Sequence, residues 1–286
     1  MYKTRHAYLF LLIPMLFLLI FTILPSIGAL YLSFTKYNVF QPIEWIGLDN
    51  YIKALTNAKF LQAMKNTVYF WALVTPALVI LPIFVAVLIN QKIPGVKYFR
   101  LIYYFPVLVS VVVTAFLWRW MFNVDGIMNF FLNMFGIDSI GWLADPKWVI
   151  PSLAVVTIWQ GFGYYALFYL AGLQSIPKDL YESADLDGAN FFQKTIYITI
   201  PMLRRIIFFV AVVSTMSAFK ELTLMLTMTN GGPLGASTTV VLLVFKEAFE
   251  NLNMGYASAI SFLLFIVILI ITLINQKLID KDPDGD

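Results

Sequence analysis

Six apolar segments, each long enough to cross a lipid bilayer, constrain this chain more than any other feature of its sequence. A transmembrane helix needs about 20 consecutive residues that are mostly apolar. Six runs reach that length: 8–32, 67–89, 101–122, 149–173, 206–228 and 256–275. The sequence therefore predicts an all-α, polytopic membrane protein, with residues 1–286 forming a single transmembrane domain of six helices.

The composition indicates the same class of protein. The chain is 60% hydrophobic and only 12% charged, whereas about a quarter of the residues of soluble domains are charged. None of the segments between the apolar runs is long enough to form a soluble domain, and no period of about 20 to 50 residues indicates a repeat array. We therefore expect the lipid bilayer to surround most of the chain.

The distribution of positive charge predicts the orientation of the chain. The first apolar run is too long for the core of a signal peptide and lacks a small-residue cleavage site, so we expect it to be retained. With the N-terminus inside, eleven basic residues fall in cytoplasmic segments: Lys3, Arg5, Lys92, Lys97, Arg100, Lys178, Lys194, Arg204, Arg205, Lys277 and Lys281. Only six fall in external segments: Lys36, Lys53, Lys59, Lys65, Lys147 and Lys246. Because Lys and Arg are enriched in cytoplasmic loops, both termini and the loop 174–205 are predicted to be cytoplasmic. The formal charge of +3 follows from this bias and indicates no nucleic-acid partner.

Several kinds of chemistry are excluded by what the chain lacks. It has no cysteine and a single histidine, His6, so disulfides, thiolate nucleophiles and Cys-ligated metals are absent. The acidic residues after position 279 are interpreted as a solvated chain end rather than a cation site. No phosphate-binding glycine loop ending in Lys-Ser or Lys-Thr occurs, and no hydrolase motif occurs. We expect no enzyme activity, no cofactor and no metal in this chain, so any ATP and Mg²⁺ would be bound by another subunit.

The predicted cytoplasmic loop, residues 174–205, contains signals for two short helices at an angle. Pro177 suits the first turn of a helix, and Ser175 could cap that helix. Gly188 can adopt a positive φ and end it, so that the next helical run, residues 190–200, leaves in a new direction. The loop is either a docking element for a partner or an ordinary amphipathic connector.

Two sets of residues within the apolar runs are candidates for contact with a solute. In a continuous helix, Ser214, Ser217 and Glu221 share one stripe, with Lys220 at its edge. Placing a charged residue inside a membrane has a high free-energy cost, so such residues should face protein or water. The stripe could line a solute pathway, or Lys220 and Glu221 could form a structural salt link. In the fourth run, after Trp159, Gly161 and Gly163 indicate either close helix packing or a local distortion, and Tyr164 offers an aromatic face.

The external segments carry turn signals and short amphipathic stretches. Residues 50–65 are predicted to lie at the membrane interface, and a short helix is expected near 240–249. The sequence Thr229-Asn-Gly-Gly-Pro predicts a turn, stiffened by Pro233, in which Gly231 and Gly232 permit unusual backbone angles.

The loop pattern E-x-A-x-x-D-G-A followed by Pro201 resembles the "EAA" loop of the membrane-spanning subunits of binding-protein-dependent ABC importers. In that family the loop docks into a cleft of a separate ATPase subunit. The resemblance marks these residues as ATPase-docking: Glu182, Ala184, Asp187, Gly188, Ala189 and Pro201. One departure is Ser183, where the family pattern most often has a second alanine.

The patterns W-x-G-x-x-Y in the fourth run and T-N-G-G-P after the fifth resemble the maltose-type permease subunit, and the resemblance covers essentially the whole chain. It marks these residues as solute-lining: Gly161, Tyr164, Ser214, Ser217 and Glu221. Glu221 corresponds to an amide in the maltose-type pattern and Ala218 replaces another, which implies a solute other than maltose.

The function that this resemblance implies is that of a permease subunit of an ATP-driven importer in a bacterial-type cytoplasmic membrane. The implied partners are a second homologous permease, two copies of an ATPase and an extracytoplasmic solute-binding protein, with a carbohydrate, most simply an oligosaccharide, as solute. A monosaccharide and a glycerol-phosphate ester remain open, since Lys220 could face a phosphate. The alternative is an ion-gradient-driven secondary transporter that uses Lys220 and Glu221 as a coupling pair, although no second copy of the 174–205 loop supports the two repeated halves typical of that class.

Overall fold

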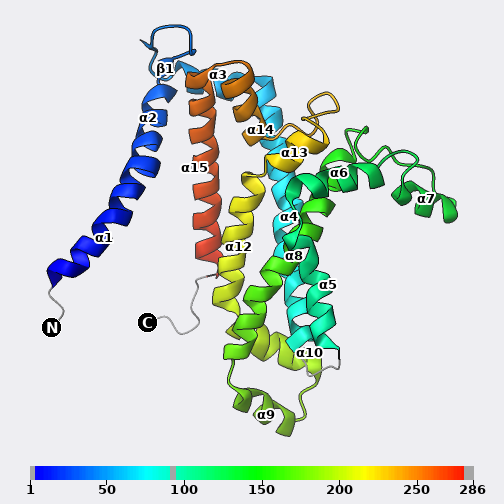
Figure 1. The fold of residues 1–286 in the computed structure, drawn as a ribbon. Helices are drawn as coiled ribbons and strands as arrows, with labels where there is room; N and C mark the ends of the chain where they lie inside the picture. The colour runs from blue at the N-terminus through cyan, green and yellow to red at the C-terminus, as the bar shows by residue number, and fades with distance from the viewer. Residues whose placement is uncertain (1–3, 91–94, 280–286) are drawn as a thin grey trace. The chain divides into compact units, whose positions relative to one another are not determined.

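The computed structural model describes residues 4–90 and 95–279, and most of them lie in helices (Figure 1). The chain forms two compact units. One unit contains the residues up to Leu61 together with Leu243–Ile266. The other contains Gln62–Leu242 and the residues from Val267 onward.

The first unit begins with a long apolar helical segment. It consists of α1 (Thr4–Leu18), a π-helical turn η1 (Leu19–Ile23) and α2 (Leu24–Ser33). Residues Phe10–Ser33 are apolar and long enough to span a membrane, and none of the most apolar stretch is buried. A short antiparallel pair, β1 (Thr35–Lys36) and β2 (Glu44–Trp45), follows and leads into α3 (Asp49–Thr56).

Side-chain hydrogen bonds from α3 and a close contact with α15 hold the first unit together at the end of α2. The side-chain amide of Asn50 donates hydrogen bonds to the carbonyls of Ser33 and Thr35, at 3.0 and 2.9 Å. Gly255, near the start of α15 (Met254–Ile279), lies directly against the Thr35 carbonyl, so a side chain there would collide with backbone. The position therefore requires glycine.

The second unit is a helical bundle that carries the candidate site. Its elements before the loop are α4 (Ala58–Asn90), α5 (Val96–Leu108), α6 (Val111–Met121), α7 (Ile127–Met134) and α8 (Val149–Ser175). The loop contains α9 (Lys178–Leu186), α10 (Phe191–Lys194), a π-helical turn η2 (Thr195–Thr199) and α11 (Ile200–Met202). After it come α12 (Arg204–Phe219) and α13 (Thr223–Met228), and α14 (Val240–Phe245) and the π-helical turn η3 (Lys246–Glu250) lead into the first unit.

The core of the second unit is apolar and is tied together by a few polar contacts between helices. Helix α8 packs against α5 and α12, and α6 packs against α13. The hydroxyl of Tyr169 on α8 donates to the Val79 carbonyl of α4 at 3.0 Å. The Trp71 indole of α4 donates to the Thr215 hydroxyl of α12, also at 3.0 Å. Both donors are thus satisfied inside the bundle, as low-dielectric surroundings require.

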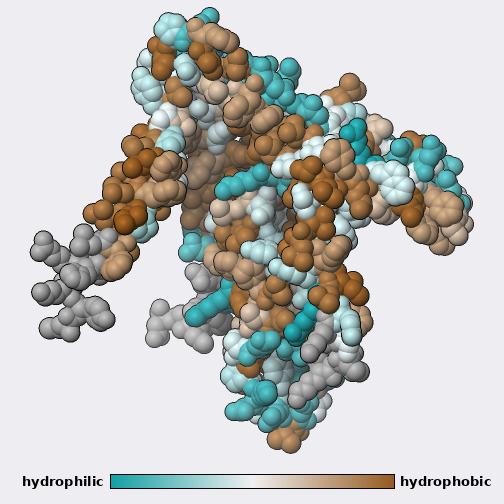
Figure 2. All heavy atoms as spheres, viewed as in Figure 1, coloured by the Kyte–Doolittle hydropathy of each residue, from teal (hydrophilic) through white to brown (hydrophobic). Residues whose placement is uncertain are grey.

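Large apolar side chains cover the outward faces of the long helices, and apolar residues occupy much of the visible surface (Figure 2). Phe84 of α4, Phe116 of α6 and Phe265 of α15 are all more than half exposed. In water such surfaces would aggregate, whereas in a bilayer they meet lipid. Within residues 4–90 and 95–279, six helical segments are long and apolar enough to span a membrane when the bent pair α5 and α6 is counted as one, which confirms the predicted fold class.

The third apolar run is a bent pair of helices rather than one continuous helix, a break that the sequence analysis did not predict. Helices α5 and α6 are bent by 98° at their junction. Pro106 cannot donate a backbone hydrogen bond, and Val109 and Ser110 are extended. The Val109 carbonyl instead accepts a hydrogen bond from the Gln160 side chain of α8, at 3.0 Å. A neighbouring helix therefore stabilises the break.

The fifth run is also interrupted, contrary to the expectation of a continuous helix. Helix α12 ends at Phe219, and α13 begins at Thr223. The Glu221 carboxylate accepts a hydrogen bond from the Leu224 N–H at 2.9 Å, so it satisfies one of the free donors at the start of α13. This side-chain bond replaces helical hydrogen bonding at the break.

One smaller expectation is met, and the interfacial position of residues 50–65 stays a prediction. A short helix near 240–249 is confirmed as α14 and η3. The stretch 50–65 contains the separate helix α3 and also the first residues of α4, whose 33 residues make it about 50 Å long. Since the hydrocarbon core is about 30 Å thick, α4 extends well beyond it.

Candidate functional site

The end of α9 is built by the glycine that the sequence analysis singled out. Gly188 has a φ of +74°, which confirms the expectation of a positive φ at this position. The Gly188 N–H donates to the Asp185 carbonyl at 3.1 Å, and the Ala189 N–H donates to the Ala184 carbonyl at 2.9 Å. This is the Schellman arrangement, which satisfies the carbonyls at a helix end. Ala184 and Ala189 thus close α9 through their backbones, and Asp187 is its C-cap.

The following turn starts a second helix in a new direction. The Asn190 side chain accepts from the Gln193 N–H at 2.9 Å, and the Gln193 side chain accepts from the Asn190 N–H at 2.8 Å. This reciprocal capping box fixes the start of α10. Pro201 lies at the start of α11, directly after the π-helical turn η2.

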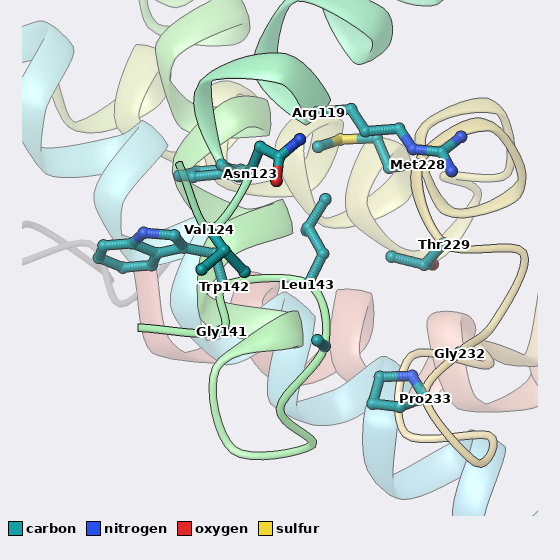
Figure 3. A pocket seen from close by; sticks show the side chains of 12 residues that line it. Arg119, Asn123, Val124, Gly141, Trp142, Leu143, Met228, Thr229, Gly232 and Pro233 are labelled. Atoms are coloured by element: carbon teal, nitrogen blue, oxygen red, sulfur yellow. The ribbon is translucent and has the colours of Figure 1, made fainter. Parts of the chain in front are cut away.

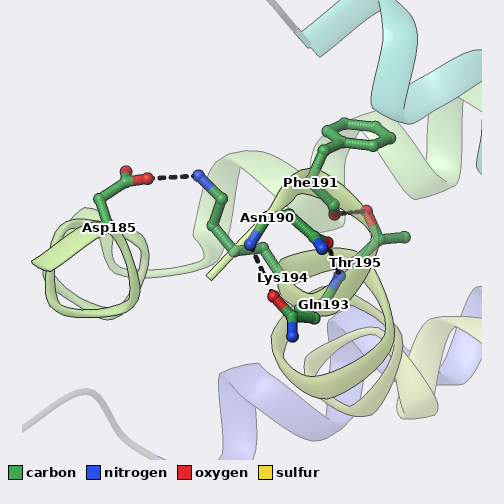
Figure 4. Close-up of polar contacts among 6 residues, drawn as sticks. All are labelled: Asp185, Asn190, Phe191, Gln193, Lys194 and Thr195. Carbon is green, nitrogen blue, oxygen red and sulfur yellow. Dashed lines mark hydrogen bonds and ion pairs between the residues drawn. The ribbon is translucent and has the colours of Figure 1, made fainter. Parts of the chain in front are cut away.

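Two side-chain contacts link the loop's helices. Lys194 forms an ion pair with Asp185 at 2.6 Å, which links α10 to the last turn of α9 (Figure 4). The Tyr181 and Thr199 hydroxyls are 2.9 Å apart and link α9 to η2. An exposed ion pair stabilises by only about 0 to 1 kcal/mol, so the backbone caps contribute at least as much to this geometry.

Apart from Tyr181 and Asp185, which bond to the rest of the loop, helix α9 exposes side chains to solvent. None of its residues is buried. Glu182 is exposed and forms no ion pair with any residue in 4–90 or 95–279. Leu186, at the end of α9, is 91% exposed, a feature that the sequence analysis did not identify. A helix with a free carboxylate and an exposed leucine is suited to a protein partner.

One detail of the predicted loop is wrong. Ser175 does not cap α9, because it is the last residue of α8 and its hydroxyl donates to the Gly172 carbonyl at 2.7 Å. Pro177 occupies the N-cap position itself, one residue before the expected first turn.

The glycines of α8 allow close helix packing, as expected. A side chain at Gly163 would collide with the backbone carbonyl of Tyr103 on α5. A side chain at Gly161 would meet the end of the Leu78 side chain at 3.3 Å. Tyr164 is 41% exposed and contacts the rings of Tyr165 and Phe168 edge-on. Gly161 therefore lies on the same segment of α8 as Tyr164, whose ring is partly exposed.

The serine and glutamate candidates do not form one helical stripe. Ser214 is fully buried and donates to the Ala211 carbonyl of its own helix. Ser217 is exposed, and its side chain interacts with the Tyr165 hydroxyl. Glu221 lies beyond the end of α12. No ion pair joins Lys220 to Glu221 in the described part of the chain, so the salt link suggested by the sequence is not formed.

A pocket of about 430 Å³ lies between the end of α6, the segment 141–144 and the Thr-Asn-Gly-Gly-Pro turn (Figure 3). Its polar side chains are Arg119, Asn123 and Thr229, and Trp142 and Phe122 supply aromatic surface. Sequence reasoning placed Arg119 within an apolar run and assigned it no role. A cation inside such a run is itself a signal of function.

The turn that borders this pocket is tightly organised. The Thr229 and Ser237 hydroxyls are 2.7 Å apart, and the Ser237 hydroxyl donates to the Gly232 carbonyl at 2.6 Å. Gly231 has a φ of +85°, as expected, whereas Gly232 has no positive φ. The remaining left-handed positions of the turn are Asn230, Leu234 and Gly235.

The described residues contain no cluster of side chains of the kind that binds metal ions. In 4–90 and 95–279 no group of three or more His, Cys, Asp or Glu side chains lies together. The acidic residues from 280 onward lie outside the described residues.

Comparison with known proteins places these features in a family. Residues 51–283 match the profile described as "Binding-protein-dependent transport system inner membrane component". The chain is 37% identical over 264 residues to "Probable ABC transporter permease protein YesP" of Bacillus subtilis, covering 91% of this chain and 85% of that protein. It is 32% identical to "Trehalose/maltose transport system permease protein MalF" of Thermococcus litoralis, covering 96% and 94%.

A solved structure shares both the fold and detectable sequence. It is described as "Crystal structure of bacterial alginate ABC transporter in complex with alginate pentasaccharide-bound periplasmic protein". The matched chain has a TM-score of 0.85 and 25% sequence identity, and the match covers 96% of this chain and 93% of that one.

Proposed function

Since the chain belongs to the family of binding-protein-dependent transport system inner membrane components, we propose that it forms half of the translocation pathway of an ATP-driven oligosaccharide importer. The chain is a multi-pass inner-membrane permease subunit and a transport component rather than an enzyme. In the proposed complex a second permease supplies the other half of the pathway, two ATPase subunits bind ATP and Mg²⁺, and a binding protein delivers the solute. Both termini are cytoplasmic, as the charge distribution indicates.

The observation that carries the proposal is the rigid, unburied helix α9. Its angle to α10 is set by the Gly188 turn, by the Asn190–Gln193 capping box and by the Asp185–Lys194 ion pair. An element that transmits force between subunits must keep its shape under load and must expose its contact surface. Glu182 and Leu186 are exposed on this element. Closure of the ATPases would displace α9, and α9 would move the spans on either side of the loop.

The class of solute rests on the relatives. Two of them are named for trehalose and maltose transport and for alginate transport, and all three solutes are saccharides. Tyr164 offers an aromatic face and Ser217 an exposed hydroxyl, which suit the apolar and polar sides of a sugar ring. Gly161, Ser214 and Glu221 complete the proposed lining. Ser214 is buried in the single chain, so it would contact solute only after a rearrangement of α12.

Variants of the loop test the docking role. Glu182→Ala should lower ATP hydrolysis stimulated by the loaded binding protein about tenfold or more, since removing one partner of a buried interfacial charge pair costs about 2 to 5 kcal/mol. Asp179→Asn changes another carboxylate of α9 and should have little effect. Gly188→Val should uncouple the complex, because a left-handed φ costs an L-residue about 1 to 2 kcal/mol. Gly188→Asn is the matched control, since asparagine tolerates that φ.

Reconstitution tests the whole proposal. Vesicles should accumulate an oligosaccharide only when the second permease, the ATPase, ATP and the binding protein are all present. Uptake driven by an ion gradient in vesicles that contain this chain alone would refute the importer and support a secondary transporter.

A further inference from the structure

The pocket around Arg119 lies at the opposite end of the second unit from the ATPase-docking loop. Helix α8 starts at Val149, five residues after the pocket residue Ala144, and ends at Ser175, where the loop begins. Its 27 residues span about 40 Å. If the loop is cytoplasmic, the pocket opens on the external side, where solute enters.

One wall of the pocket is fixed by a buried asparagine. Asn129 on α7 is 1% exposed, and its side-chain oxygen accepts hydrogen bonds from the Ile140 N–H and the Trp142 indole N–H, both at 3.0 Å. Its amide donates to the Val124 carbonyl at 3.0 Å. The Trp142 ring also packs on Phe122, with centroids 5.5 Å apart. The ring is therefore held in place before any ligand arrives.

The opposite wall is fixed by the hydroxyls of the Thr-Asn-Gly-Gly-Pro turn. Ser237 bonds to both Thr229 and the Gly232 carbonyl, and the Asn66 amide of α4 donates to the carbonyls of Gly235 and Thr238 at 3.0 Å. Hydrogen bonds thus hold both walls in place, and preorganisation of this kind lowers the entropic cost of binding.

The charge of the pocket is positive and uncompensated. Arg119 is the only charged residue among the twelve that line it, and no carboxylate is among them. Arg119 is exposed and forms no ion pair with any residue of the described ranges. Arginine at the external end of a span also runs against the cytoplasmic bias of positive charge, so membrane topology does not account for it. Its planar guanidinium can bind a carboxylate through two parallel hydrogen bonds.

We propose that the Arg119 pocket is an entry site for an acidic saccharide, in which Arg119 binds the carboxylate of a uronic acid unit. The proposal rests on the proposed function and narrows its solute class. A volume of about 430 Å³ lies in the range of small-ligand sites, which are typically about 300 to 1,000 Å³. Asn123 and Thr229 supply hydrogen-bonding groups for hydroxyls, as in Figure 3.

The test uses the complete importer in vesicles and two probes that differ only in charge. One probe is a trisaccharide of uronic acids, and the other is its carboxyl-reduced, neutral counterpart. Arg119→Gln should lower uptake of the acidic probe about tenfold or more, since a charge-assisted hydrogen bond is lost. Uptake of the neutral probe should change little, because that probe has no carboxylate for Arg119 to bind.

Two further variants control for folding and for general effects of charge. Arg119→Lys keeps the charge but not the bidentate geometry, so it should retain more acidic-probe uptake than Arg119→Gln. Arg100→Gln removes an exposed arginine at the other end of the bent pair, and should not discriminate between the probes. Uptake is normalised to the amount of assembled complex.

The outcomes separate this inference from the function on which it rests. Equal loss of both probes in Arg119→Gln would mean that the pocket docks an acidic side chain of the binding protein, and would overturn the saccharide site. No loss with either probe would also overturn it. Uptake of neutral but not acidic oligosaccharides by the native importer would refute the acidic solute class and leave the proposed function intact. If the complete importer takes up no saccharide of any kind, the proposed function itself fails.

Discussion

Gly163→Ala is expected to separate α5 from α8. The added Cβ would collide with the Tyr103 carbonyl oxygen and would also lie 3.2 Å from the carbonyl carbon and 3.3 Å from the Tyr103 ring. The carbonyl belongs to a helix backbone and cannot rotate away, so one helix must shift. Gln160 of α8 donates a hydrogen bond to the Val109 carbonyl at the bend. A shift of α8 would therefore also strain the junction of α5 and α6.

The expected change in the free energy of unfolding is the difference between two opposing contributions. Overpacking a rigid site costs typically 1 to 3 kcal/mol, and contact with backbone places this site at about 3 kcal/mol. Replacing glycine by alanine inside a helix returns about 1 kcal/mol. We therefore expect a net loss of about 2 kcal/mol, which corresponds to a fall in Tm of roughly 4 to 8 °C for a protein of this size.

Gly161→Ala on the same helix is the matched control. Its Cβ would meet only the end of the Leu78 side chain, at 3.3 Å, and a leucine can adjust its rotamer. The two opposing terms then nearly cancel, so Tm should change by no more than about 2 °C. Both variants are compared by thermal unfolding of the purified complex, followed by tryptophan fluorescence. Equal Tm values for Gly163→Ala and Gly161→Ala would refute the argument that backbone contact at Gly163 limits the packing distance.

Two further predictions concern polar groups of the second unit. Asn129→Ala should destabilise the segment 123–148 by about 2 kcal/mol or more, since it leaves the Ile140 and Trp142 N–H groups without their acceptor. Faster limited proteolysis of that segment would show this, and Asn133→Ala, which removes only an exposed contact with Ser139, should leave proteolysis unchanged. Glu221→Ala should cost about 1 kcal/mol through loss of the cap on Leu224, and Glu221→Gln, which keeps an acceptor, less. A double-mutant cycle of Glu221→Ala with Lys220→Ala should show coupling below about 0.5 kcal/mol; a larger value would restore the salt link.

The sequence by itself determined the class of fold and the shape of the loop. The length of each apolar segment alone identifies the membrane spans, because a helix needs a minimum number of apolar residues to cross the bilayer. The angle after α9 could be predicted because it depends on one residue: only Gly188 in that segment readily adopts a φ of +74°. The spans and the turn at Gly188 both depend on residues close together in the sequence, so both can be predicted from the sequence alone.

The tertiary structure decided the breaks in the spans and the pocket. The bend after Pro106 is stabilised by Gln160, which bonds the Val109 carbonyl from 51 positions further along the chain. A hydropathy profile does not reveal that hydrogen bond. The stripe of Ser214, Ser217 and Glu221 was predicted from helical periodicity, which fails where the Glu221 side chain competes with the backbone for the Leu224 N–H. Arg119 becomes part of a site only because α6 packs against α13 and brings the segment 141–144 and the turn at Thr229 around it. Contacts between residues far apart in sequence decide such features, and no single segment encodes them.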